Sequence, residues 1–141
     1  MNNPTDLPSC ITATVVPDSR RLSFLPKTFG RLMMKVEQEV FSQMAELCAD
    51  YRGGYWHFFE LSNGGGFLVL ASGDPVKISV EGNGYAGSVS AEAAGIIVTL
   101  FALSHLASRY SDADMLSERF HQLRDFALDH PEREAILAAI D

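Results

Sequence analysis

The sequence predicts an α+β fold, in which a short antiparallel β-meander of three to four strands packs with about four α-helices in a single domain over residues 1–141. Three observations lead to this prediction. Two pairs of strand-like segments flank glycine-rich turns in the middle of the chain. Helical patterns precede and follow them. Finally, 47% of the residues are hydrophobic, which is enough to build one core in a chain of this length.

The first predicted elements are a strand and a long helix. Residues 11–16, ITATVV, are rich in β-branched side chains and stop at Pro17, which predicts a short strand at a sheet edge. After RRLSFLPKTFG, apolar residues recur at spacings of three and four from Phe29 to Tyr51. We therefore expect one long helix, with its apolar side on the sheet and its end at the glycine pair 53–54.

An aromatic hairpin follows in GGYWHFFELSNGGGFLVL, residues 53–70. Residues 55–61 favour a strand, SNGGG supplies the positive φ angles of a tight reversal, and FLVLA returns as the second strand. Alternation along the strand places Trp56 and Phe58 on one face and His57 and Phe59 on the other. Since neither face is purely polar, both should be covered, and we expect this strand to be central in the sheet.

A second hairpin and three helices complete the predicted layout. VKISV and YAGSV flank the turn EGNG and should extend the meander to about four strands. Ser90 favours the start of a helix over residues 91–109, whose uncharged stretch of 16 residues is shorter than the roughly 20 that span a membrane. We therefore expect a buried helix there. Another helix should begin at Ser111 or Asp112, and a short last helix should begin at Pro131.

The net charge of −7 is unevenly distributed. Residues 1–36 carry five basic and two acidic side chains, a net charge of +3, whereas residues 112–141 carry three basic and eight acidic ones, a net charge of −5. Strong DNA binding calls for more clustered cations, and mimicry of DNA calls for long rows of carboxylates that arginines interrupt here. We expect neither property.

The N-terminus and the cysteines predict a cytoplasmic protein. MNNPTDLPSCITATVV has no basic start followed by an apolar run, which a secretory signal requires. Cys10 and Cys48 lie far apart without CxxC spacing, a pattern typical of two thiols in a reducing compartment.

The residue types suited to catalysis do not converge in the predicted elements. His57 and Glu60 fall on opposite faces of their strand, so they cannot act together without a bulge. Glu118 and His121 have the spacing of one half of a carboxylate-bridged di-iron site, but the second Glu-x-x-His and its two companion acids are missing. The glycine-rich turns join strands and lack the lysine and hydroxyl of a phosphate-binding loop. We expect no catalytic, cofactor-binding or metal-binding residues.

Three segments together resemble a known family: RLSFLPKTFG (21–30), the helix end DYRGG (50–54) and YWHFFELSNGGGF (55–67). They are similar to the plasmid antirestriction protein family typified by ArdB and KlcA, and the resemblance covers most of the chain. It implies a non-enzymatic bacterial protein of a mobile element that relieves restriction by the host's type I restriction-modification systems. It also implies a protein partner, either the restriction complex or a host factor linked to it.

From probable exposure beside the hairpin, we expect six polar residues to contact this partner: Arg20, Arg21, Glu60, Asn63, Asp112 and Asp114. Two other function classes stay open at this stage. One is a small hydrolase or transferase that uses His57 and an acid from another segment. The other is a single-stranded nucleic-acid-binding module that stacks bases on the aromatic strand, although few basic residues lie near that strand.

Overall fold

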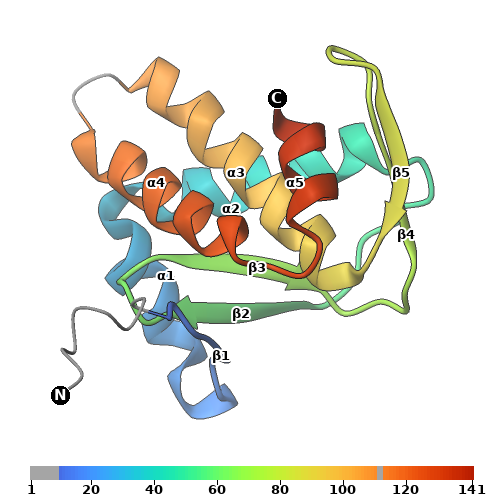
Figure 1. Ribbon diagram of the computed structural model, residues 1–141. Coiled ribbons are helices and arrows are strands. Elements are labelled where there is room, and N and C mark those ends of the chain that lie inside the picture. The colour runs from blue at the N-terminus through green and yellow to red at the C-terminus, as the bar shows by residue number, and fades with distance from the viewer. Residues whose placement is uncertain (1–9, 111–112) are drawn as a thin grey trace, which may run out of the picture.

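The computed structural model describes residues 10–110 and 113–141 and confirms the predicted α+β class. Figure 1 shows β2 and β3 side by side, with α3, α4 and α5 above them, α1 running past their left end, and the β4–β5 hairpin standing at the right. The elements in chain order are β1 (Ala13–Val15), the 3-10 helix η2 (Asp18–Arg20), α1 (Arg21–Phe29), the 3-10 helix η3 (Gly30–Leu32), α2 (Met33–Leu47), β2 (Trp56–Leu61), β3 (Gly66–Leu70), β4 (Val76–Val80), β5 (Tyr85–Val89), α3 (Ala91–Arg109), α4 (Asp114–Leu128) and α5 (Arg133–Ile140).

The aromatic strand β2 is the centre of a three-stranded antiparallel sheet in the order β1-β2-β3, as its two-sided apolar pattern predicts. On one face, Phe24 of α1 stacks on Phe58 with ring centroids 4.9 Å apart. On the opposite face, Phe67 of β3 lies between Phe59 of β2, at 5.1 Å, and Phe126 of α4, at 5.8 Å. The sheet is therefore covered by α1 on one side and by α4 on the other.

The helix α3 is buried, as predicted, and packs against β3. Although α3 is long and apolar enough to cross a membrane by length and composition, most of that stretch is buried inside the protein. The Oγ1 of Thr99 accepts a hydrogen bond from the backbone N–H of Leu68 at 3.3 Å. One turn earlier, a Cβ on Gly95 would lie 2.3 Å from the carbonyl oxygen of Leu68. Glycine is therefore required for helix and strand to approach so closely.

The predicted single helix from Phe29 to Tyr51 is wrong in its boundaries. The chain forms α1 over the preceding segment, turns through η3 at Gly30, which has a φ of 59°, and continues as α2. The left-handed φ of Gly30 cannot continue an α-helix, so the apolar periodicity bridges a break. α2 ends at Leu47 because Cys48 is extended, and Tyr51 instead packs its ring against Trp56, 6.1 Å away.

The predicted second hairpin exists, but β4 and β5 form a separate two-stranded sheet instead of extending the first one. Val76, Ile78 and Val80 are buried while the residues between them are exposed, so one face of this hairpin packs on the helices. Its turn is held by Asn83, whose Nδ2 donates to the carbonyl oxygens of residues 138 and 139 at 3.2 and 2.7 Å. The hairpin is thus anchored to α5 rather than to β3.

The last two helices follow the predicted order. α4 begins at Asp114, and the predicted starts at Ser111 and Asp112 lie outside the described residues. α5 follows Pro131 and ends at Ile140, in agreement with the sequence pattern.

Candidate functional site

A cluster of charged side chains lies where α1 meets β2. The Nη1 of Arg20 donates to both carboxylate oxygens of Glu60, at 3.2 and 3.1 Å, and the Nζ of Lys27 lies 3.5 Å from Oε2. The hydrogen bond from Arg20 lowers the pKa of the Glu60 carboxyl, although partial burial acts in the opposite direction. The structure thus joins two of the predicted contact residues and adds Lys27, which the sequence did not single out.

Arg21 is placed differently from its neighbour. Its Nη1 donates to the carbonyl oxygen of Trp56 at 3.0 Å, and its guanidinium carbon lies 4.6 Å from the ring centroid of Tyr55 and 4.2 Å from that of Phe58. Such stacking on aromatic faces is a favourable use of an arginine. Arg21 is therefore a half-buried side chain that holds α1 on β2, in addition to any role in binding.

Asn63 is also engaged within the fold. Its Nδ2 donates to the carbonyl oxygen of Gln122 at 3.0 Å, and its Oδ1 accepts from the N–H of Gly65 at 3.1 Å. Gln122 returns a hydrogen bond from Nε2 to the carbonyl oxygen of Asn63 at 2.8 Å. Nearby, Arg119 donates from Nε to the carbonyl oxygen of Thr28 at 2.6 Å. These bonds tie the turn of the hairpin and the end of α1 to α4.

A polar hollow of about 300 Å³ connects the two groups just described. Lys27, Glu60 and Arg119 line it, together with the glycines of the hairpin turn. Of the remaining predicted contact residues, Asp114 is exposed in the first turn of α4, and Asp112 lies outside the described residues. The structure therefore gathers Arg20, Glu60 and Lys27 at one place and leaves Asp114 at the start of another helix.

His57, the residue of the enzyme alternative, is half-buried on β2 and has its ring edge-on to Tyr55, with centroids 5.3 Å apart. Within residues 10–110 and 113–141, the side chain of His57 has no hydrogen-bond partner. The same residues contain no group of three or more histidine, cysteine, aspartate or glutamate side chains that could hold a metal ion. The aromatic neighbours of His57 on β2, Trp56 and Phe58, are buried, which leaves little surface on which bases could stack.

A hydrogen-bonded group around His130, which the sequence did not reveal, lies at the start of α3. The Nε2 of the buried His130 is 2.8 Å from Oε2 of Glu92, and its Nδ1 accepts from the N–H of Glu132 at 2.9 Å. Nε2 therefore carries the ring hydrogen, and both nitrogens are occupied. Ser90 donates to the carboxylate of Glu132 and accepts from the N–H of Ala93 at 3.1 Å. The group caps α3, and the Glu132 carboxylate that accepts from the serine hydroxyl also accepts from the backbone N–H of Ser90 at 3.0 Å.

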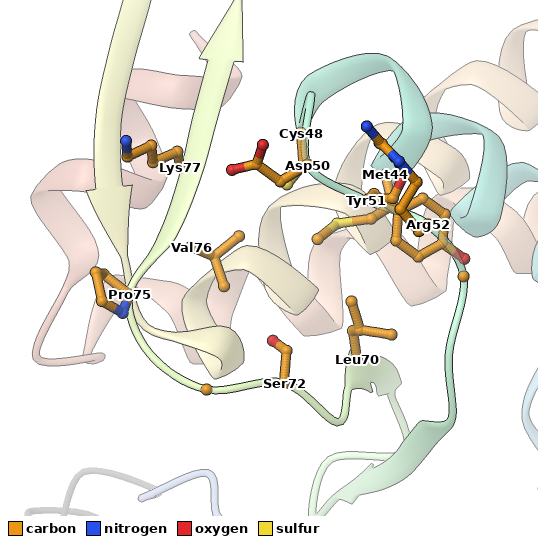
Figure 2. Close-up of a pocket in the computed structure, with 12 residues that line it drawn as sticks. Met44, Cys48, Asp50, Tyr51, Arg52, Leu70, Ser72, Pro75, Val76 and Lys77 are labelled. Atoms are coloured by element: carbon orange, nitrogen blue, oxygen red, sulfur yellow. Dashed lines mark hydrogen bonds between the residues drawn. The ribbon is translucent and has the colours of Figure 1, made fainter.

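A second hollow, of about 310 Å³, lies between the end of α2 and the β3–β4 connection. Figure 2 shows Met44, Leu70 and Val76 extending into it, with Asp50 and Lys77 on the side nearer β4. Its wall includes the buried thiol of Cys48, which follows the last residue of α2. The arrangement is an apolar floor with charges of both signs at the rim, without a paired nucleophile and base.

Comparison with known proteins gives consistent results over nearly the whole chain. Residues 49–141 match the family model described as antirestriction protein. Two antirestriction proteins KlcA from Escherichia coli are 48% and 47% identical to this chain. Those matches cover 96% and 93% of this chain and 97% and 95% of the two relatives.

A solved structure of the KlcA and ArdB proteins is similar with a TM-score of 0.89 and 46% identity, and the match covers 100% of both chains. Those proteins show a novel fold and antirestriction activity against type I DNA restriction systems in vivo but not in vitro. The resemblance seen in the sequence is thereby confirmed, and this chain belongs to the antirestriction protein family.

Proposed function

We propose that this protein is made by a mobile element and relieves restriction of incoming DNA by type I restriction-modification systems of the host. The observation that carries the proposal is the match over 100% of both chains to the structure of KlcA and ArdB, proteins with activity against these systems in vivo. At 46% identity and a TM-score of 0.89, the two chains share the same backbone fold.

The proposed mechanism is non-catalytic binding to a protein partner in the cytoplasm. Similar proteins are active in vivo but not in vitro, which favours a target or a state of the target that exists only in the cell. This partner is either the restriction complex or a host factor linked to it. Ser90 and His130 are both engaged in hydrogen bonds at the start of α3, which supports binding over catalysis at that place.

Among the predicted contact residues, Arg20, Glu60, Asp112 and Asp114 are the ones we propose for the partner, with Lys27 beside the first two. Arg20 and Lys27 have side chains that are 47% and 70% exposed, and Glu60 is partly accessible at 24%. Arg21 and Asn63 offer a partner only the atoms that their contacts inside the fold leave free.

The proposal is tested by the plating efficiency of unmodified phage on cells that carry a type I restriction system, with and without this protein. Phage already modified by the same system serves as the control, because restriction does not act on it. We expect relief confined to unmodified phage. No relief from a soluble, expressed protein would reject the proposed function for that system.

The contact residues are tested by a double variant, Arg20→Ala with Glu60→Ala. Removing both partners of an exposed ion pair changes stability little, since such pairs contribute about 0.2–1 kcal/mol. The variant should therefore keep its thermal unfolding curve and lose relief of restriction. Ser42→Ala, at an exposed position on α2, is the matched control and should keep both the unfolding curve and relief. Full relief by the double variant would remove Arg20 and Glu60 from the contact site.

A further inference from the structure

An apolar surface lies uncovered on α1 and the start of α2, and we call it the α1–α2 surface. Its most exposed members are Leu22, Met34 and, beside α1, Tyr55, with 96%, 64% and 51% of their areas accessible. These are the three most exposed large hydrophobic side chains in the described part of the chain. Contiguous exposed apolar residues on a small protein mark an interaction site more often than isolated ones do.

Of these three exposed residues, Leu22 lines a hollow of about 310 Å³ between the two helices, and Met34 directly follows Met33, which also lines it. Leu22, Leu25 and Pro26 form one wall at helical spacings of three and four, and Met33 of α2 faces them. Because these side chains line a concavity, an apolar side chain from outside would gain contacts on several sides when it enters. Methionine adapts to such a guest because its side chain is unbranched and flexible.

The charged residues at the rim of this surface are mostly basic. Arg21 and Glu37 line the hollow, and Arg21 also stacks on Tyr55. Arg31 and Lys35 lie outside the hollow and are exposed on η3 and the first turn of α2, at helical spacing around Met34. Neither Arg31 nor Lys35 forms an ion pair with any described residue. Residues 1–36 have a net charge of +3 in a chain whose net charge is −7. Of their basic residues, Arg20 and Lys27 pair with Glu60, and Glu37 lies in the hollow, so anionic groups would be attracted chiefly to Arg31 and Lys35.

We propose that the α1–α2 surface binds an acidic, amphipathic segment of a protein partner. Apolar side chains of that segment cover Leu22 and Met34, and its carboxylates meet Arg31 and Lys35. Methionine, tyrosine and arginine, the side chains exposed here, are enriched at protein interfaces. This inference rests on the proposed function, to which it adds the surface and the chemistry of the partner.

Two other anionic partners fit the surface less well. Nucleic acid is bound chiefly through phosphates, and such contacts leave an apolar centre uncovered. An anionic membrane attracts the basic rim and takes up apolar side chains, but it repels the remainder of a chain with a net charge of −7. We therefore favour a protein segment and treat membrane binding as an outcome of the test.

The test replaces apolar side chains at the surface by charged ones in the full-length protein. The double variant Leu22→Asp with Met34→Asp should lower relief of restriction about tenfold or more, because losing a central apolar contact commonly costs that much affinity. Leu22→Met with Met34→Leu keeps the surface apolar and should retain relief. Ser42→Asp adds a charge at an exposed site farther along α2 and serves as the matched control.

Each result then has one meaning. Loss of relief in the aspartate variant, with an unchanged thermal unfolding curve, supports the inference. If the aspartates lower the melting temperature, Leu22→Gln with Met34→Gln tests the same contact without adding charge. Full relief by these variants overturns the inference but leaves the proposed function intact, whereas absence of relief by the unaltered protein rejects the proposed function itself.

Charge reversal and vesicles separate the kinds of partner. Arg31→Glu with Lys35→Glu should also lower relief, because it would repel the carboxylates of the partner, and unchanged relief would overturn the acidic character we assign. The unaltered protein should not sediment with vesicles of phosphatidylglycerol and phosphatidylcholine. Sedimentation that the aspartate variant abolishes would assign the surface to a membrane and overturn the inference.

Discussion

The helices α1 and α3 use their apolar side chains in opposite ways. In α3, every residue from Ala93 to Leu100 is buried, and no charged residue lies between Glu92 and Arg109. In α1, only three residues are buried, and Leu22 is almost completely exposed. The apolar residues of α3 therefore stabilise the fold, whereas those on the outer side of α1 are free to contact another molecule. Four predictions test this difference between structural and exposed side chains.

The largest effect is expected on the inner side of α1. Phe24 is 1% exposed and stacks on Phe58, so Phe24→Ala should lower the free energy of unfolding by about 3–5 kcal/mol. Leu22→Ala, on the outer side of the same helix, should change it by less than about 0.5 kcal/mol. Urea denaturation of both variants measures the difference. Equal losses of unfolding free energy would show that α1 does not have one side that stabilises the fold and one side that is exposed.

The next effect concerns the contact between α3 and β3. Gly95→Ala should lower the free energy of unfolding by about 1–3 kcal/mol, because the added Cβ would overlap the backbone of Leu68. This loss should outweigh the gain in helix propensity, which is about 1 kcal/mol. Gly73→Ala is the control, since a Cβ there meets no atom within 4 Å. A Gly95→Ala variant more stable than the parent would contradict the close packing of α3.

The start of α3 provides a smaller effect. Ser90→Ala removes the hydroxyl that caps the helix at Ala93 and donates to Glu132, and it should lower the free energy of unfolding by about 1 kcal/mol. Ser104→Ala, at an exposed position later in α3, should have little effect. Thermal unfolding followed by circular dichroism compares the two variants, and similar melting temperatures would argue against a cap at Ser90.

The smallest effect concerns the charged cluster beside α1. Arg20 lowers the pKa of Glu60, so the stability that this pair contributes is present above the ordinary carboxyl pKa of 4.5 and disappears as the pH falls through the lowered value. Glu60→Gln should therefore cost about 0.2–1 kcal/mol at neutral pH and progressively less in acid. Denaturation curves recorded from neutral to acid pH test this, and a difference that does not shrink in acid would contradict it.

The polar contact residues show how far sequence reasoning reaches. Arg20 and Arg21 are adjacent and equally basic, so their sequence positions do not distinguish them. In the structure, Arg20 binds the partly buried carboxylate of Glu60, while Arg21 stacks on two aromatic rings. The difference arises because α1 crosses β2, and only the side chain pointing toward the sheet meets Tyr55 and Phe58.

The break between α1 and α2 shows a second limit. Apolar residues at helical spacing continue across Gly30 because both segments must cover the same core, and the periodicity therefore conceals the turn. Pro26 and Gly30 were the available signals, since both disfavour an uninterrupted helix. Which of them would end the first helix depended on how α1 packs against the sheet.

The sequence by itself determined the α+β class, both hairpins, the cap and burial of α3, and the resemblance to antirestriction proteins, because these depend on local periodicity, turn residues and short motifs. Only the tertiary structure decided that β4 and β5 separate from the first sheet, that Lys27 joins Glu60, and that the apolar residues of α1 divide between a buried and an exposed side. The reason is physical: these features depend on contacts between segments distant in the chain, which form only when the helices and sheets pack together.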